Sequence, residues 1–372
     1  MRAIRGQIFN PQGEFFFGEI EISGSKITNI SALSKESLSS EEQERLIIPG
    51  LVDIHTHGCF GHDTCDASYE GEKSIVDYEK SHGITSFCPT TMTLDEDTLT
   101  KICKNIAEVK KTTDVIKGIY LEGPFISEGK KGAQNPKYIM KPDYDMIARL
   151  NDASGGIVKV VAIAPEVEGA LEVIKKGSNQ FRFSIAHTEA NVDEAAAAIE
   201  AGAKHVTHLY NAMPAYSHRA PGVIGAAADS DDTRVELICD GIHIHPAVIK
   251  NTFKLFGPER VILISDSMEA TGMPNGTYSL GGQTVHMKDR RATLDDGTIA
   301  GSASNLYDCL SYAISIGVDK ASAIFAATRN PAKEIGIYEE VGSIEIGKAS
   351  DILIISKDFE LQNVIQCEED II

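Results

Sequence analysis

The chain has 372 residues, of which 42% are hydrophobic and 24% charged, and its formal net charge at pH 7 is −19. These values are typical of a soluble globular protein with one large and one smaller domain, and the negative charge argues against nucleic acid or an anionic membrane as a partner. No apolar run is long enough to cross a bilayer, the N-terminus lacks the apolar segment of a secretory signal, and the seven cysteines form no CxxC pair, so we expect a cytoplasmic protein with reduced thiols.

Both ends of the chain have the pattern of short β-strands. Residues 1–46 contain short apolar runs with partial alternation, separated by turn residues, and residues 337–365 resemble them. Neither piece can bury a good core alone. We therefore predict a small β-sandwich domain built from residues 1–48 and 341–372, with a catalytic domain of residues 49–340 inserted between them.

The middle of the chain alternates between candidate strands and helical patterns, which is typical of βα units. Candidate strands recur roughly every thirty residues. They are expected at residues 51–57, 83–90, 116–122, 158–165, 181–188, 204–209, 235–240 and 260–266. Eight such strands close a parallel barrel. The predicted fold is therefore α/β, a (β/α)8 TIM-type barrel with a small β-sandwich domain built from both chain termini.

Two helix starts are marked by capping boxes, in which a polar side chain is followed three residues later by glutamate. Thr93 and Glu96 form the first pattern, and Asn191 and Glu194 form the second. We expect helices to begin at these two places.

The first barrel strand carries the motif LIIPGLVDIHTHG. Because strand side chains alternate between faces, Asp53, His55 and His57 are expected to share one face. Two imidazoles two residues apart at a strand end can bind one cation. A pair of surface histidines is the alternative for this motif alone. Asp53 is expected to orient a histidine or to cap a turn.

Ionisable residues recur at the ends of the predicted strands. They are His55, His57, Glu122, His187, His208 and Asp266. In a parallel barrel, catalytic groups lie at the C-terminal ends of the strands. A buried carboxylate needs a partner such as a metal. A core histidine is the alternative at each single position, and the convergence of several such groups favours a metal site.

His205 competes with His208 as a ligand. Strand alternation places Val206 and His208 on one face and His205 on the other, so we assign His205 to the helix-facing side. Lys159 lies too early in the fourth strand to reach the site.

Arg219 and His243 follow the sixth and seventh strands. Arginine binds phosphate through two parallel hydrogen bonds, and Arg219 would give an acidic protein a local site for an anion. We expect His243 to contact a ligand and His245 to be a surface imidazole.

Several motifs occur in the order seen in one known family. The chain resembles the amidohydrolase superfamily and, within it, the N-acetylglucosamine-6-phosphate deacetylase family. The motifs that carry the resemblance are PGLVDIHTHG, YLEGPF, AHTEA, THLYNAM with HRAPG, CDGIH, ISDSMEATGMPNG and DGTIAGS. HxH marks only the superfamily, whereas LEGPF, HLYNAM and SDSMEATG are more specific.

The resemblance implies a role for each site residue. Glu122, His187 and His208 would hold the principal divalent metal, His55 and His57 a second one that shares Glu122, and Asp266 would be the catalytic acid and base. The implied substrate contacts are Ala133, Asn211, Ala212, Arg219, His243, Ala300 and Gly301. A homodimer in which His243 completes the neighbouring subunit's site is also implied.

The implied reaction is metal-dependent hydrolysis of N-acetyl-D-glucosamine 6-phosphate to D-glucosamine 6-phosphate and acetate, in amino-sugar catabolism. Gln134 stands where some family members that use one metal carry histidine, so this chain resembles the members that use two. Zinc or iron suits the ligands first, and cobalt or manganese next.

Three alternatives stay open. They are deacetylation of the galactosamine epimer, hydrolysis of another amide such as a cyclic ureide, and non-catalytic binding of a sugar phosphate by a regulator. The lack of a lysine at the site on the fourth strand argues against ureide hydrolysis, and Asp266 argues against a mere binder.

Overall fold

A computed structural model describes residues 2–366 and 369–371. Its centre is an eight-stranded sheet in which neighbours in the chain are neighbours in the sheet, and every pair is parallel. The strands are β5 (Leu51–Thr56), β8 (Ile84–Thr91), β9 (Ile119–Leu121), β10 (Val158–Ile163), β11 (Arg182–Ile185), β12 (His205–Val206), β13 (Arg234–Ile238) and β14 (Val261–Ile264). All eight lie within the ranges expected from the sequence, apart from single residues at the edges.

Hydrogen bonds between the ends of the first and last strands close this sheet into a barrel. The Asp266 N–H donates to the His55 carbonyl over 3.0 Å, and the His57 N–H donates to the Ser267 carbonyl over 2.8 Å. The predicted (β/α)8 barrel is thus confirmed, and the closing bonds lie beside the candidate site.

The strand residues divide between two apolar cores. Val160 and Ala162 of β10 belong to the core inside the barrel, and the alternating Val161 and Ile163 belong to the core between strands and helices. This period of two is the one expected of strands that are buried on both faces.

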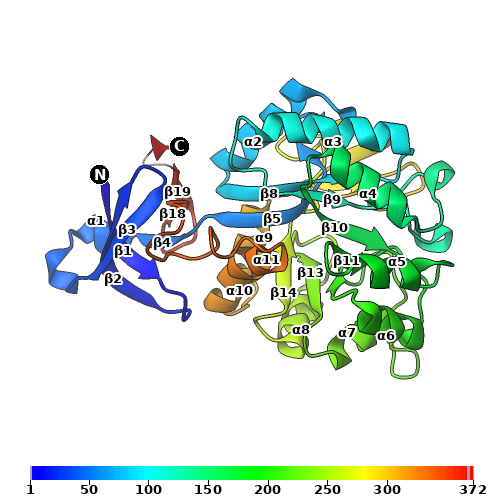
Figure 1. Cartoon of the computed structure of the whole chain (residues 1–372). Helices are drawn as coiled ribbons and strands as arrows, with labels where there is room; N and C mark the ends of the chain where they lie inside the picture. The colour runs from blue at the N-terminus through cyan, green and yellow to red at the C-terminus, as the bar shows by residue number, and fades with distance from the viewer. Residues whose placement is uncertain (1, 367–368, 372) are drawn as a thin grey trace.

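Helices follow most of the barrel strands and cover the outside of the barrel (Figure 1). They are α2 (Tyr69–Ser81), α3 (Glu96–Lys110), α4 (Tyr144–Ala153), α5 (Ala170–Gly177), α6 (Val192–Ala201), α7 (Gly222–Asp229), α8 (Pro246–Phe256), α9 (Leu306–Ser315) and α10 (Lys320–Ala327). Short 3-10 turns lie at Lys35–Ser37, Thr64–Asp66, Glu128–Lys130 and Pro136–Tyr138.

The two predicted helix starts have different outcomes. The Asn191–Glu194 capping box opens α6 as expected. The Thr93–Glu96 box is wrong, because the side chain of Asp95 caps α3 by accepting the Thr98 N–H. Thr93 instead lies in the buried turn before the helix, where its N–H donates to the side chain of Gln134.

The segment α11 (Arg329–Glu334) and the residues after it close the N-terminal end of the barrel. Ala332, Ile335 and Val341 share the interior core with Val52 and Ile262, which lie near the starts of β5 and β14. The end opposite the strand-end residues is therefore sealed by this part of the chain.

The two chain ends pair in a seven-stranded mixed sheet, which lies beside the barrel (Figure 1). Its strands are β1 (Arg2–Phe9), β2 (Phe15–Ser23), β3 (Lys26–Ala32), β4 (Leu46–Pro49), β18 (Ile352–Ile355), β19 (Leu361–Gln366) and β20 (Glu369–Asp370), and α1 (Ser40–Glu44) precedes β4. β4 joins the two halves, because it pairs with β1 on one side and with β18 on the other. The small β-domain built from both termini is thus confirmed, and its exact boundaries stay a prediction.

An insertion that the sequence reading missed lies between β14 and α9. It is the antiparallel sheet of β15 (Gly276–Leu280), β16 (Gln283–Lys288) and β17 (Arg291–Thr293). Two hydrogen bonds hold it. The Gly281 N–H donates over 2.8 Å to Asp63 in the short strand β7 (His62–Asp63), which pairs with β6 (Gly58–Cys59). The side chain of Gln283 donates to the Ala133 carbonyl. The insertion is therefore tied to loops around the strand ends.

Six cysteines of the described residues carry free thiols, and Cys367 lies outside the described residues. Within the described ranges, none of the helices is long and apolar enough to span a bilayer.

Candidate active site

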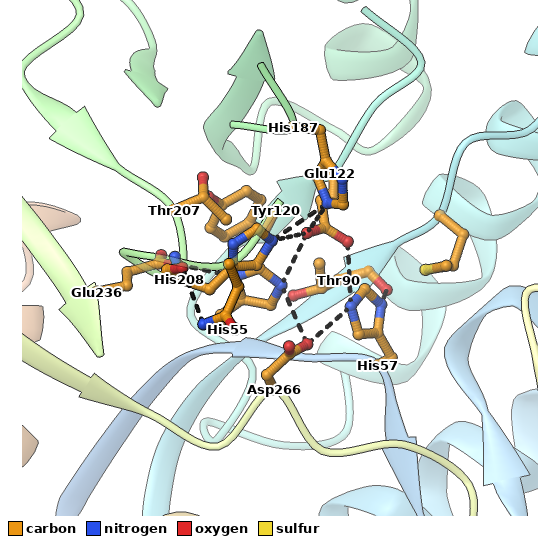
Figure 2. Close-up of polar contacts among 12 residues, drawn as sticks. His55, His57, Thr90, Tyr120, Glu122, His187, Thr207, His208, Glu236 and Asp266 are labelled. Atoms are coloured by element: carbon orange, nitrogen blue, oxygen red, sulfur yellow. Dashed lines mark hydrogen bonds and ion pairs between the residues drawn. The ribbon is translucent and has the colours of Figure 1, made fainter. Parts of the chain in front are cut away.

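Six predicted residues come together at the C-terminal ends of five barrel strands, and all six are buried (Figure 2). They are His55 at the end of β5 and His57 directly after it, Glu122 after β9, His187 after β11, His208 after β12 and Asp266 after β14. The strand-end rule thus placed these residues in the right part of the fold.

One group of three surrounds the first carboxylate oxygen of Glu122. Its Oε1 lies 3.0 Å from His208 Nε2 and 3.2 Å from His187 Nε2, and the two nitrogens are 3.2 Å apart. These three atoms therefore face one common point.

A second group lies on the other side of Glu122. His57 Nε2 is 3.2 Å from Glu122 Oε2 and 3.3 Å from Asp266 Oδ1, and His55 Nε2 is 3.6 Å from Asp266 Oδ1. Within each group the ligand atoms lie within 4.8 Å of one another. Glu122 is placed to serve both groups.

The tautomers of three histidines are fixed by oxygen atoms that face the ring nitrogen pointing away from the site. His187 Nδ1 faces the Lys130 carbonyl at 2.9 Å, His57 Nδ1 the Thr90 carbonyl at 3.3 Å, and His55 Nδ1 a carboxylate oxygen of Glu236 at 2.9 Å. These oxygens only accept, so each Nδ1 carries the proton and each Nε2 directs a lone pair into the site.

Lone pairs of imidazoles and carboxylates therefore face one another in the site, and the buried Nε2 of His55 has no hydrogen-bond partner. Such a cluster needs positive charge at its centre. Neutral histidines with fixed outer N–H groups, combined with carboxylates, are the donor set of divalent metal sites in proteins. The residues present thus fit a metal.

The charges of the cluster act in the same direction. Burial alone would raise the pKa of Glu122, but the histidines around it, His55 first, hold its pKa well below the usual range. Burial would also raise the pKa of Asp266, but the neighbouring histidines outweigh it and lower this pKa, and the hydrogen bond with His57 has the largest effect among them. The two carboxylates are therefore ionised at neutral pH and attract a cation.

Left-handed backbone conformations turn several of these side chains into the site. The φ angles are +44° at His187, +28° at His208 and +49° at Asp266. Residues other than glycine seldom adopt this region, and where they do it often marks a functional position.

His205 does not lie where strand alternation placed it. Its ring is fully buried between Glu236 and Glu334, and Val206 packs toward the helices instead. The helix-facing assignment of His205 is therefore wrong. β12 ends at Val206, and the turn at His208 brings that ring to the site by a route that strand alternation does not describe.

Asp53 also departs from the predicted pattern. β5 contains a register shift between Asp53 and Thr56, which breaks the alternation. The Asp53 carboxylate accepts the N–H groups of His55 and Ser265, and burial, followed by the nearby charge of Asp53, raises the pKa of Glu79 in α2. Asp53 thus lies on the helix side and orients the backbone of His55, so its predicted place on the HxH face is wrong.

A pocket of about 280 Å³ opens onto the metal-binding groups. Five of the six site residues line it, all but His55, together with Met92, Gly132, Ala133, Gln134, Asn211, Ala212, His243, Leu280, Thr298, Ile299 and Gly301. Ala300 is buried behind the wall, between two residues that line it. Most of the predicted substrate contacts therefore face this pocket.

Two predicted contacts need comment. His243 lines the pocket of its own chain, where its Nδ1 lies 2.7 Å from Asp240, and its contribution to a neighbouring subunit's site stays a prediction. Arg219 is exposed and does not line the pocket. His245 is exposed as expected and caps α8.

Sequence reasoning assigned no role to several lining residues. Leu280, Thr298 and Ile299 belong to the insertion after β14 and its return to the barrel, which no strand-end pattern marks. Gln134 donates to Glu122 Oε2 over 2.7 Å and accepts the Thr93 N–H over 2.7 Å. The only sequence signal for Gln134 was that it stands where some members of the family carry histidine.

The closed parallel barrel with histidine and carboxylate groups at its strand ends defines the class of barrel hydrolases that work with bound divalent metals. The model of the amidohydrolase family matches residues 46–366, and the chain belongs to this family.

Known relatives match over nearly the full length of the chain. The chain is 37% identical over 356 residues to N-acetylglucosamine-6-phosphate deacetylase of Bacillus subtilis, covering 92% of this chain and 90% of the relative. It is 32% identical over 330 residues to N-acetylgalactosamine-6-phosphate deacetylase of Escherichia coli O157:H7, covering 87% of each. Its fold is similar to that of a mutant N-acetyl-D-glucosamine-6-phosphate deacetylase from Mycobacterium smegmatis solved with N-acetyl-D-glucosamine-6-phosphate, with a TM-score of 0.94, 30% identity and coverage of 100% and 99%.

Proposed function

We propose that this protein hydrolyses N-acetyl-D-glucosamine 6-phosphate to D-glucosamine 6-phosphate and acetate, a step of amino-sugar catabolism. The observation that carries the proposal is the position of Glu122 between two histidine groups, with the ionised Asp266 3.3 Å from His57 at the floor of a pocket. The names of the relatives support the substrate class.

Glu122, His187 and His208 would hold the principal metal, and His55 and His57 a second one that shares Glu122. A divalent cation bound there supplies a water of lowered pKa and polarises the amide carbonyl. The mixed nitrogen and oxygen ligands suit zinc or iron first, and cobalt or manganese next.

Asp266 is the proposed general base and acid. Its lowered pKa keeps it ionised at neutral pH, so it can take a proton from the attacking water. It then gives that proton to the amide nitrogen, which leaves as a neutral amine rather than as a strongly basic anion. Its backbone is held on both sides, by the His55 carbonyl and by the Ser302 N–H, which keeps the carboxylate in place.

The pocket walls are the proposed contacts for the sugar. Ala133, Asn211, Ala212 and Gly301 present small side chains or backbone to the pocket, with Ala300 packed behind them. The Nδ1 of His243 faces a carboxylate oxygen of Asp240 and therefore carries its proton, which leaves Nε2 to meet the substrate.

The phosphate needs a cation that the pocket wall does not supply, because none of the described residues lining it is lysine or arginine. We assign this role to Arg219, which is exposed on the loop that continues from Ala212. Arg219 reaches the phosphate either by a movement of this loop or from a second copy of the chain in a proposed homodimer.

The division into residues 1–48 with 341–372 and residues 49–340, and a cytoplasmic location, belong to the same proposal. The seven-stranded sheet joining both chain ends supports the division. The free thiols of the described cysteines agree with a reducing compartment.

A second candidate substrate is the galactosamine epimer, because a relative of comparable coverage is named N-acetylgalactosamine-6-phosphate deacetylase. Measuring acetate release from both 6-phosphate epimers, with the unphosphorylated sugar as a control, separates the candidates. Preference for the gluco epimer is expected, and preference for the galacto epimer would replace the proposed substrate. Release from neither would overturn the proposed function.

A further inference from the structure

A continuous line of buried ionisable groups runs from the candidate site through the barrel to its sealed end. It begins at His55, whose Nδ1 lies 2.9 Å from Glu236 Oε2. Glu236 Oε1 lies 2.9 Å from His205 Nε2, and His205 Nδ1 lies 3.0 Å from Glu334 Oε1. His55, His205, Glu236 and Glu334 are all buried. Nothing in the proposed reaction uses the last three.

Glu236 holds one member of each metal-binding group with a single oxygen atom. Its Oε2 accepts from His55 Nδ1 and also accepts the backbone N–H of His208 over 3.1 Å. Figure 2 shows Glu236 beside both histidines, on the side away from Asp266. One carboxylate therefore fixes the tautomer of His55 and the strained turn at His208, whose φ is +28°.

His205 is placed to be an imidazolium. Each of its two ring nitrogens faces a carboxylate oxygen, Glu236 on one side and Glu334 on the other, and carboxylate oxygens only accept. Both nitrogens must then carry hydrogen. Burial lowers the pKa of His205, but its bonds to the two carboxylates, Glu236 first, raise that pKa to about 9.

Arginines complete the line at the sealed end of the barrel. Arg182 Nε lies 2.8 Å from Glu334 Oε1, and Arg234 donates to Glu334 Oε2 over 2.7 Å. The side chains of Arg182 and Arg234 are 32% and 27% exposed, whereas that of Glu334 is fully buried. Charge thus alternates from negative Glu236 to positive His205, to negative Glu334 and to the two arginines, so each buried charge is paired.

We propose that Glu236 is a positioning residue for both metal-binding groups and that the imidazolium of His205, held by Glu334, keeps Glu236 in place. This role of Glu236 extends the proposed function and rests on its metal-binding part. Loss of the Glu236 charge replaces the charge-assisted hydrogen bonds from His55 Nδ1 and from the His208 N–H by weaker bonds to a neutral acceptor. The Nε2 lone pair of His55 and the turn at His208 are then held less firmly toward the site.

The first test reads the protonation of His205 directly in the full-length, metal-free protein. In 15N-histidine NMR at pH 7.5, His205, assigned by its loss in His205→Gln, should show both ring nitrogens protonated. In Glu236→Gln, the amide oxygen can still face His55 and His208 while its NH₂ faces His205 Nε2, which must then give up its hydrogen. The His205 signal should therefore change to that of a neutral ring. A neutral His205 in the unchanged protein would overturn the proposal.

The second test measures metal affinity by competition with a chelator, using zinc as the probe. Glu236→Gln should weaken binding about 10- to 100-fold, the range typical when a residue that orients a metal-bound histidine is replaced. The matched control is Glu79→Gln, because Glu79 is also fully buried but lies in α2 with neither carboxylate oxygen hydrogen-bonded. The control should bind zinc as the unchanged protein does.

A purely structural role would lower the unfolding temperature of Glu236→Gln and leave zinc affinity unchanged in the folded protein, which would overturn the proposal. If Glu236→Gln does not fold, His205→Gln replaces it, because Glu236 then stays but loses its cation, and weaker zinc binding is again expected. In the active protein, kcat should fall more than KM rises, since Glu236 does not line the pocket. If zinc binding weakens in Glu236→Gln as expected but the unchanged protein releases no acetate, the proposed substrate is wrong and the role of Glu236 stands.

Discussion

Asp266→Asn removes one negative charge from the site and keeps the size of the side chain. The backbone should tolerate the change, because asparagine adopts left-handed conformations more readily than most residues and φ is +49° at this position. The hydrogen bonds to the His55 carbonyl and from the Ser302 N–H involve only the backbone and persist. Asp266 is not a member of the Glu122, His187 and His208 group, so that group should keep its metal.

The amide cannot take a proton from water or deliver one to the leaving nitrogen. Loss of a positioned proton-transfer group costs about 10²- to 10⁴-fold in rate, or about 3 to 5 kcal/mol in activation free energy. The assay is acetate release under saturating substrate, with metal content measured by elemental analysis on the same sample.

The matched control is Asp289→Asn. Asp289 also has a left-handed backbone, with a φ of +51°, but it is an exposed turn residue of the insertion. Its replacement should leave the rate unchanged. Turnover by Asp266→Asn within a few-fold of the unchanged enzyme, with metal present, would refute the role assigned to Asp266.

Two further predictions concern the phosphate and the stability of the fold. Arg219→Ala should lower kcat/KM for the 6-phosphate substrate about 10- to 100-fold, as expected for a lost charge-assisted hydrogen bond, and leave activity on the unphosphorylated sugar unchanged; equal losses on both would contradict the assignment. Mixing Arg219→Ala with Asp266→Asn subunits should restore activity only if Arg219 acts from a second copy. Burial, the main cause, raises the pKa of Glu72 from 4.5 to about 8, so the native state holds this proton where the unfolded state has lost it. Stability should therefore fall as pH rises from about 4.5 to 8, and Glu72→Gln should raise the unfolding free energy at pH 8, on the order of a few kcal/mol, with little effect at pH 4. A gain that is the same at both pH values would argue against a protonated Glu72.

Strong local patterns made the barrel and most of the site predictable. Buried parallel strands are apolar runs, and the rule that polar groups gather at their C-terminal ends found Glu122 and Asp266 although they lie 144 positions apart in the numbering. Short or irregular strands defeated the same reasoning. β12 has two residues, too few for alternation to decide between His205 and His208, and the shift in β5 moved Asp53 to the other face.

Contacts between distant segments could not be read from local patterns. Glu236 sits within the apolar strand RVELI, and its partners His55 and His205 lie on other strands. Glu334 reaches His205 from a helix 129 residues later in the chain. The insertion after β14 supplies part of the pocket wall, but its hairpins resemble ordinary surface loops in sequence. Only the closed fold shows that these segments meet.

The most direct test of the account is acetate release from N-acetyl-D-glucosamine 6-phosphate before and after removal of metal. The purified protein should contain one or two divalent ions per chain and release acetate and the free amino-sugar phosphate in equal amounts. Treatment with a chelator should abolish the activity, and adding zinc or iron(II) back should restore it. Release that persists in protein shown to be free of metal, or a fully loaded protein that releases no acetate, would contradict the account.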